Sequence, residues 1–104
     1  MKIVAVCACP TGVAHTYMAK AALEKAAAKL GHSIKVEAQG ALGIENEITK
    51  EEAGAADVVI LAVEIGIDKR ERFEGRPTVN IPVQMAVRSP ENVLRKIEEK
   101  LKNR

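Results

Sequence analysis

The sequence predicts a single α/β domain of Rossmann-like type: a four-stranded parallel sheet, in the order 2-1-3-4, flanked by helices on both faces. Three observations support this. β-Favouring runs alternate with helical stretches, which is typical of a parallel sheet wrapped by helices. Two of the runs are continuously apolar, as in strands buried on both faces. The 104 residues are enough for one core without disulfide or metal staples.

The first strand and the first helix are predicted from a change in hydrophobic period. Residues 3–7 form a continuous apolar run, which favours a strand buried on both faces. Residues 9–12 interrupt this run. From about His15 to Leu30 the apolar residues recur at helical spacing, and Gly31 is a natural stop. The predicted apolar stripe is Ala19, Ala22, Leu23, Ala26, Ala27 and Leu30.

The middle of the chain repeats this order. Residues 34–39 alternate apolar and polar side chains, which predicts a half-exposed strand at an edge of the sheet. Thr49 followed by Glu52 is a capping box, so a short helix is expected there, ending near Gly54. Residues 58–63 form the second continuously apolar strand. Residues 64–75 are expected to be a charged loop or a brief helix.

The last part predicts an edge strand and a final helix. Residues 78–81 lie between Pro77 and Pro82, which suits a short edge strand. Ser89 is expected to cap a helix with Pro90 at its first position. Its apolar stripe is Val93, Leu94, Ile97 and Leu101. Placing the two continuously apolar strands at the centre gives the strand order 2-1-3-4, joined by right-handed crossovers.

Composition excludes several classes of function. Sixteen Lys and Arg against fourteen Asp and Glu give a net charge of +2, which argues against a nucleic-acid binder. Tyr17 and Phe73 are the only aromatic residues, so stacking of bases or sugar rings is disfavoured. The apolar runs are far shorter than the ~20 residues of a membrane-spanning helix. No signal peptide is evident, and Cys7 and Cys9 are too close for a disulfide framework, so the cytoplasm is expected.

The segment after the first strand is the best candidate for a site. In a sheet of order 2-1-3-4 the strand order reverses there, and ligands bind outside the carboxyl ends of the strands. The helix dipole would favour the thiolate of Cys9, and the amides from Thr11 to Thr16 could cradle phosphate oxygens. A packing role for this cysteine is the alternative interpretation. The expected phosphate-binding residues are Pro10, Thr11, Gly12, Val13, Ala14, His15 and Thr16.

The other reactive residues are weaker candidates. Cys7 lies inside the first strand and is expected to be a buried small hydrophobe. His32 is expected to be an exposed loop residue. Cys7, Cys9 and His15 would offer a metal only three ligands in poor geometry, so no metal site is predicted. Residues 69–72 (KRER) are typical of a solvated surface, with contact to a phosphate or an acidic partner as the alternative.

A low-molecular-weight tyrosine phosphatase or arsenate reductase is the main rival function. These enzymes carry C-x5-R in the same strand–loop–helix setting, but this chain has His15 where the arginine would stand. Neither Asp57 nor Asp68 precedes a proline, so the Asp-Pro general acid is also missing. Hydrolysis of a phosphocysteine should then be slow. A loop that accepts phosphate without hydrolysing it acts as a carrier.

The octapeptide CPTGVAHT, residues 9–16, resembles the fructose-type enzyme IIB domain of the bacterial phosphoenolpyruvate-dependent sugar phosphotransferase system. The resemblance extends over essentially the whole chain, so residues 1–104 are expected to be one IIB-type domain. It includes Gln39-Gly40 with Gly43 and Asn46, the segment 56–59, and Arg72-Phe73.

The resemblance implies a phosphoryl relay. Cys9 would accept phosphate from a phosphohistidine of a IIA partner and pass it to a sugar, by default fructose, held by a membrane-embedded IIC partner. The amides and hydroxyls from Thr11 to Thr16 would hold the phosphate in both steps. The chain would be a phosphotransferase that needs no metal, nucleotide or other cofactor. It would lie in the cytoplasm, at the inner face of the membrane through IIC.

Overall fold

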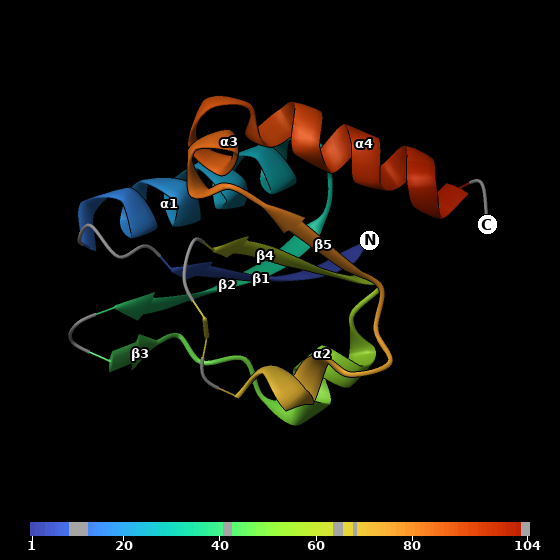
Figure 1. The fold of residues 1–104 in the computed structure, drawn as a ribbon. Coiled ribbons are helices and arrows are strands. Elements are labelled where there is room, and N and C mark those ends of the chain that lie inside the picture. Colours follow the sequence, from blue (N-terminus) through green and yellow to red (C-terminus); the bar gives the residue numbers. More distant parts are fainter. Residues whose placement is uncertain (9–12, 41–42, 64–65, 68, 103–104) are drawn as a thin grey trace.

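A mixed β-sheet forms the middle layer of the molecule (Figure 1). The computed structural model describes residues 1–8, 13–40, 43–63, 66–67 and 69–102. In this part of the chain the sheet has five strands in the order β3-β2-β1-β4-β5. Their bounds are β1 (Lys2–Ala8), β2 (Ser33–Gly40), β3 (Gly43–Glu45), β4 (Val58–Val63) and β5 (Thr78–Ile81).

The parallel part of the sheet confirms the predicted order. β1 pairs with β2 and β4, and β4 pairs with β5, all parallel, so the four expected strands lie in the order 2-1-3-4. β1 is buried along its length beyond Lys2, and β4 is buried up to Val63, as their apolar runs predict. The continuous hydrophobic runs therefore identified the centre of the sheet.

The prediction of a purely parallel, four-stranded sheet is wrong, because β3 adds a fifth strand antiparallel to β2. β3 begins at Gly43, whose φ of +107° is a conformation that favours glycine. Asn46 follows with φ +54°, and its Nδ2 donates a hydrogen bond of 2.9 Å to the Val36 carbonyl. β3 is therefore the edge strand next to β2, which lies inside the sheet.

The burial predicted for β2 is also wrong on its polar face. Its burial rises toward the carboxyl end, where Glu37 and Gln39 are buried together with their apolar neighbours. An alternating pattern predicts solvent on the polar side, but here the segment after β3 and a 3-10 turn cover that side. The buried polar side chains are held by the hydrogen bonds described below.

Three helices cover the upper face of the sheet in Figure 1: α1 (Val13–Lys29), α3 (Val83–Arg88) and α4 (Pro90–Lys102). α1 begins two residues before the predicted start, and α3 was not predicted. α4 begins at Pro90 as expected. The apolar residues of α1 and α4 meet the sheet in one core cluster, whose helical members include Ala19, Leu23, Ala26, Ala27, Val93, Leu94 and Ile97.

The opposite face carries α2 (Lys50–Ala55) and the 3-10 helix η1 (Arg70–Phe73). The predicted capping box is confirmed: the Glu52 amide donates to Thr49 Oγ1 at 3.1 Å, and the Thr49 amide donates to Glu52 Oε1 at 2.9 Å. The core cluster on this side comprises Val4, Val6, Ile48, Ala53, Ala56, Val59, Leu61 and Phe73. Helices thus cover both faces, as expected.

His32 is not the exposed loop residue that the sequence predicts. Its Nε2 contacts the Glu98 carboxylate of α4, and its Nδ1 lies 3.0 Å from the Met1 backbone nitrogen. Only 10% of its side chain is exposed. His32 therefore ties the turn between α1 and β2 to the final helix.

Within the described residues, none of the helices combines the length and apolar character needed to cross a membrane.

Candidate functional site

The candidate site lies where the carboxyl ends of β1, β2 and β4 meet. Ala8 ends β1, and the strand register places it opposite Gln39 on one side and Val63 on the other. β2 and β4 lie on opposite sides of β1, so the order of the strands reverses beside β1. This is the switch point at which open α/β sheets bind ligands.

Four of the predicted site residues, Cys9, Pro10, Thr11 and Gly12, lie outside the described residues. Along the chain they join Ala8, the last residue of β1, to Val13, the first residue of α1. The segment that contains the candidate nucleophile therefore connects the switch point to the N-terminus of a 17-residue helix. Helix N-termini favour anions through their unpaired amides and their dipole.

The other four predicted residues, Val13, Ala14, His15 and Thr16, form the first turn of α1. Their amides thus belong to the helix end itself, where the sequence suggested a loop. His15 is exposed. Thr16 is only 1% exposed, and its Oγ1 has no hydrogen-bond partner among the described residues. A buried hydroxyl without a partner is costly, so Thr16 favours a ligand or a chain segment placed against the start of α1.

Cys7 has the opposite character. It is fully buried in the cluster beneath α1, and burial raises the pKa of its thiol to about 12. A thiol of this pKa is protonated at neutral pH and is neither a good nucleophile nor a metal ligand. The expectation that Cys7 is a buried small hydrophobe is confirmed.

A buried ion pair lies on the α2 face of β2, next to the site. Arg72 Nη1 and Nη2 donate to Glu37 Oε1 and Oε2, both at 2.6 Å. The Ile48 amide donates to Glu37 Oε1 at 2.8 Å, and Gln39 Nε2 donates to Glu37 Oε2 at 2.7 Å. The exposed fractions of the Arg72 and Glu37 side chains are 7% and 0%. We call these residues, Glu37, Gln39, Ile48 and Arg72, the Glu37 network.

The ionisation of Glu37 is set by this network. Burial acts to raise the pKa of Glu37, but the hydrogen bonds from Arg72, Gln39 and the Ile48 amide outweigh it, so the pKa lies below its ordinary value. The carboxylate is therefore charged at neutral pH and is balanced by the guanidinium. Each carboxylate oxygen accepts two hydrogen bonds, which is the condition under which a buried charge is tolerated.

The expectation of a solvated surface for residues 69–72 is only partly right. Lys69 and Arg70 are exposed, and Lys69 Nζ pairs with Glu47 at 2.9 Å. Arg72 turns inward, and its guanidinium also lies 4.6 Å from the centroid of the Phe73 ring. Sequence reasoning missed this role because Glu37 and Arg72 are 35 positions apart. The only signal was that Gln39-Gly40 and Arg72-Phe73 both contribute to the family resemblance.

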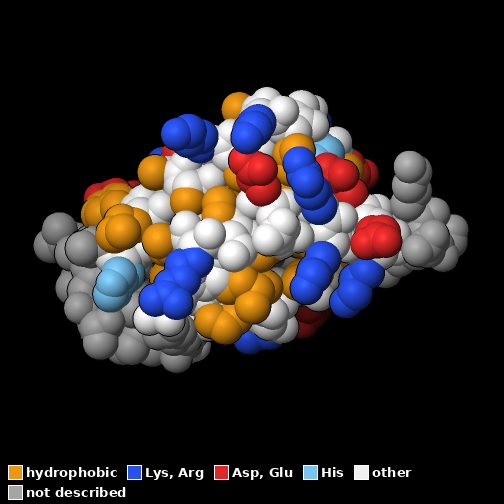
Figure 2. All heavy atoms as spheres, turned by 90° about the horizontal axis from the view of Figure 1, so that it is seen from above, with side chains coloured by type: hydrophobic (Ala, Val, Ile, Leu, Met, Phe, Trp, Pro, Cys, Tyr) orange, Lys and Arg blue, Asp and Glu red, His pale blue; other side chains and the backbone are white. Residues whose placement is uncertain are grey.

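Exposed hydrophobic side chains occur near the start of α1. Among the described residues, the large hydrophobic side chains left exposed are Tyr17 (39%), Met18 (52%) and Met85 (46%). Tyr17 also donates a hydrogen bond to Glu45 of β3, which raises the pKa of its hydroxyl. Figure 2 shows hydrophobic side chains over the end of this face from which α1 starts and over its middle, with charged side chains of both signs among and beyond them.

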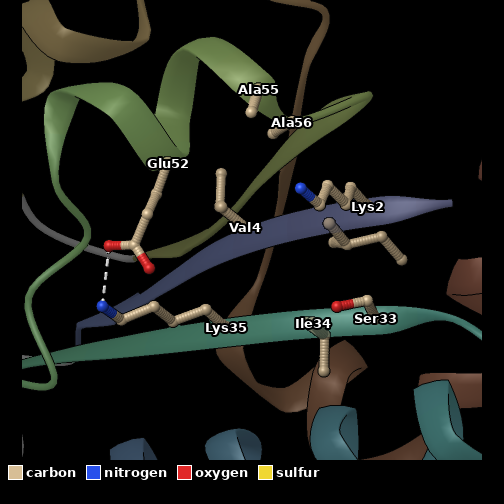
Figure 3. A pocket seen from close by; sticks show the side chains of 9 residues that line it. Lys2, Val4, Ser33, Ile34, Lys35, Glu52, Ala55 and Ala56 are labelled. Atoms are coloured by element: carbon tan, nitrogen blue, oxygen red, sulfur yellow. Dashed lines mark hydrogen bonds and ion pairs between the residues drawn. The ribbon is translucent and has the colours of Figure 1, made fainter.

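A cavity of about 140 Å³ lies at the other end of the strands (Figure 3). Lys2 and Ser33, the first residues of β1 and β2, line it together with Ala55, the last residue of α2, and Ala56, which follows that helix. Lys35 and Glu52 point toward one another across it and pair at 2.7 Å. Six residue steps of β1, roughly 20 Å, separate Lys2 from Ala8, so this cavity is not part of the candidate site.

Sequence comparison shows which protein family this chain matches. The family described as "PTS system, Lactose/Cellobiose specific IIB subunit" matches residues 4–96. The "PTS system fructose-like EIIB component 2" of Escherichia coli K12 is 51% identical over 100 residues, covering 96% of this chain and 94% of that protein. Component 1 from the same strain is 42% identical over 98 residues, with coverages of 94% and 91%.

Solved structures give the same result. An enzyme IIB subunit of the PTS system from E. coli K12 superimposes with a TM-score of 0.92 at 40% identity, covering 98% of this chain and 94% of that one. A domain of the fructose-specific IIABC component from Borrelia burgdorferi gives a TM-score of 0.86 at 50% identity, with coverages of 91% and 90%. From the match over residues 4–96 and these full-length similarities, the chain belongs to the IIB family of the sugar phosphotransferase system.

Proposed function

We propose that this chain carries a phosphoryl group on Cys9 during sugar uptake. The Cys9 thiolate accepts the group from a phosphohistidine of a IIA partner and passes it to a sugar held by a membrane IIC partner. The observation that carries the proposal is the position of Cys9 in the chain. It directly follows the central strand β1 at the switch point and precedes the first turn of α1.

Two substitutions at phosphorus make up the relay. In the first, Cys9 Sγ attacks phosphorus, the S–P bond forms, the P–N bond to the histidine breaks, and the ring nitrogen keeps the electron pair. In the second, a sugar hydroxyl oxygen attacks, the O–P bond forms, the S–P bond breaks, and the thiolate is regenerated while the hydroxyl proton leaves to a base. Such transfers depend mainly on alignment and on stabilisation of the phosphoryl oxygens.

The start of α1 supplies this stabilisation. We propose that the phosphate is bound by Pro10, Thr11, Gly12, Val13, Ala14, His15 and Thr16. The unpaired amides and the dipole of a 17-residue helix attract its oxygens. The buried Thr16 hydroxyl, which lacks a partner in the described chain, is a suitable donor. Exposed His15 in the same turn is available to contact the phosphate or the incoming partner.

Two groups that a phosphatase could use, Arg72 and Asp57, have partners elsewhere in the fold. The guanidinium of Arg72 is held by buried Glu37. Asp57 Oδ2 accepts a hydrogen bond of 2.8 Å from the Lys2 amide, which places Asp57 at the amino end of β1. Asp68 lies outside the described residues. The missing guanidinium at position 15 and the distant Asp57 favour a carrier over the phosphatase or arsenate reductase alternative.

The partners follow from this chemistry. In the first transfer IIA must bring its phosphohistidine to Cys9, and in the second IIC must bring the bound sugar. The surface near the start of α1 must therefore contact IIA and IIC in turn. Exposed Tyr17 and Met18 provide apolar contact area there. The names of the curated relatives favour fructose as the sugar. We place the chain in the cytoplasm, at the inner face of the membrane through IIC.

Incubation with a phosphorylated IIA protein, followed by intact-mass analysis, tests the assignment. We expect the native chain and Cys7→Ala to gain one phosphoryl group and Cys9→Ser to gain none. A phosphoryl group on the Cys9→Ser protein would contradict the proposal. Sustained hydrolysis of an aryl phosphate by the chain alone would support the phosphatase alternative instead.

A further inference from the structure

We infer that the Glu37–Arg72 ion pair is the positioning device of the proposed phosphoryl-transfer site, fixing the carboxyl end of β2 and, through the strand pairing, that of β1, after which Cys9 follows in the sequence. The inference rests on the proposed function, since it concerns the rate at which Cys9 accepts its phosphoryl group. Neither Glu37 nor Arg72 is proposed to touch the phosphate. Their effect is exerted through the strand end and the segments that they fasten.

The strand register brings the pair close to the site. Glu37 is opposite Val6, and Gln39 is opposite Ala8, the residue before Cys9. Residues 37 and 39 point to the same face of β2, and their side chains are joined by the hydrogen bond of 2.7 Å. Glu37 therefore lies two residues, roughly 7 Å, before the level at which β1 ends.

The pair fastens two separate segments to β2. Ile48, in the segment between β3 and α2, donates its amide to Glu37 and accepts a bond of 2.7 Å from Arg72 Nη1 through its carbonyl. Arg72 Nε donates to the Lys69 carbonyl at 2.8 Å, closing the turn that enters η1. Gln39 is held at the end of β2 itself. The segments that follow β2 and β4 are thus anchored beside the end of β1.

Stability alone is a weak reason for such a pair. Burying two charges costs several kcal/mol per ion before their attraction is counted, and well-packed apolar residues often serve stability as well or better. A bidentate guanidinium–carboxylate pair instead fixes distance and orientation, because it has two parallel hydrogen bonds and a planar geometry. Fixed geometry at this place matters, because displacement of a reacting group by 1 Å can cost about a hundredfold in rate.

Among the described residues, two neighbouring lysines have carboxylate partners of their own. Lys35 Nζ pairs with Glu52 of α2 at 2.7 Å, and Lys69 Nζ, at the start of η1, pairs with Glu47 at 2.9 Å. Arg70 and Glu71 of η1 are exposed. Removing one member of the Glu37–Arg72 pair leaves the other member charged and buried without its ion-pair partner.

The kinetic test compares two Arg→Lys variants from the same short helix. Arg72→Lys keeps the charge but cannot make both bonds to Glu37 together with those to Ile48 and Lys69. We expect its single-turnover transfer rate at saturating phosphorylated IIA to fall by about tenfold or more, with little change in half-saturating donor concentration. Arg70→Lys, at an exposed position, should transfer as the native chain does. Rates are compared at a temperature where circular dichroism shows each variant fully folded.

A second readout does not depend on the donor protein. In a Cys7→Ala background, the rate of iodoacetamide labelling of Cys9 is followed against pH. Glu37→Gln and Arg72→Gln change the charge in opposite senses but break the same bidentate pair. A positioning role therefore predicts that both move the labelling midpoint to higher pH, because the start of α1 stabilises the thiolate less well. A through-space effect of charge would move the two midpoints in opposite directions, and a purely structural role would leave both unchanged.

The outcomes separate this inference from the proposed function. If the native chain gains no phosphoryl group on Cys9, the proposed function fails. If it does, but Arg72→Lys transfers at the native rate, or the two midpoints shift in opposite directions or not at all, the positioning role is overturned and the carrier assignment stands. Reduced transfer by folded Arg72→Lys, together with shifts of both midpoints to higher pH, supports the inference.

Discussion

The two ends of the parallel sheet carry similar side chains in different settings. At the amino end, Lys35 of β2 pairs with Glu52 of α2, and about a third of each side chain is exposed (30% and 40%). Two residues further along the same face of β2, Glu37 pairs with Arg72 at 0% and 7% exposure. Exposed pairs contribute little to stability, whereas breaking a buried pair is costly. The buried and geometrically demanding pair lies at the end where phosphoryl transfer is proposed.

The largest difference is expected between the thiol of Cys7, which lies inside β1, and the thiol of Cys9, which follows β1 in the sequence. At pH 8 the native protein should react with iodoacetamide at Cys9 on the order of a thousandfold faster than at Cys7, because burial raises the pKa of Cys7 to about 12. In denaturant the two rates should converge. Mass spectrometry of the labelled peptides measures both rates, and equal labelling of the native protein would contradict the difference.

The next effect concerns the two ion pairs directly. Glu37→Ala leaves the Arg72 guanidinium buried without its partner, and we expect a loss of about 3–5 kcal/mol in unfolding free energy. Lys35→Ala, two residues away on the same strand face, should cost only a small fraction of that, because its pair is partly exposed. Urea unfolding of both variants makes the comparison. Similar losses would mean that the two ends of the sheet do not differ as described.

A smaller effect is expected at the start of α2, the helix that packs over the cavity at the amino end. Thr49→Ala removes the side-chain acceptor of the Glu52 amide and should cost about 1 kcal/mol. Thr49→Ser keeps a hydroxyl and should lose much less. Thermal unfolding followed by circular dichroism measures both variants. If Ser destabilised as much as Ala, the capping hydrogen bond would not be the source of the loss.

The smallest effect is a pH dependence at the amino end. Hydrogen bonds from Lys35 and the Thr49 amide lower the pKa of Glu52 from 4.5 to about 2. A lowered carboxyl pKa contributes stability that is complete above the unfolded value and is lost as pH falls through the folded value. The melting temperature should therefore drop between about pH 4.5 and about pH 2, and Glu52→Gln should flatten part of that drop. Glu37, whose pKa is also lowered, supplies a further drop that persists in this variant.

Features encoded locally could be predicted from the sequence. The continuous apolar runs identified β1 and β4, and the capping box identified the start of α2, because each depends on residues within a few positions. β3 could not be predicted, since it has only three residues and exists by pairing with β2. α3 has six residues, and its N-cap Pro82 makes no side-chain capping bond, so no local signal announced it.

The candidate site also has one part that could be predicted from the sequence and one part that could not. The sequence of residues 9–16 pointed to phosphate chemistry at the start of a helix, and the structure places that helix at the switch point. The Glu37 network could not be predicted, because alternation along β2 suggested solvent at Glu37 and the residue that neutralises it is Arg72 of η1. The contact with Arg72 allows Glu37 to be buried, although the local sequence pattern predicts that this residue is exposed.

Locating the phosphoryl group tests the account most directly. Cleavage after Lys2 and Lys20 yields one peptide that contains Cys7, Cys9 and His15 together, so fragmentation within this peptide decides between them. After reaction with a phosphorylated IIA protein, we expect the phosphoryl group on Cys9 and a peptide that returns to its unmodified mass when sugar and IIC are added. A phosphoryl group on His15, on Cys7 or outside this peptide would contradict the central claim.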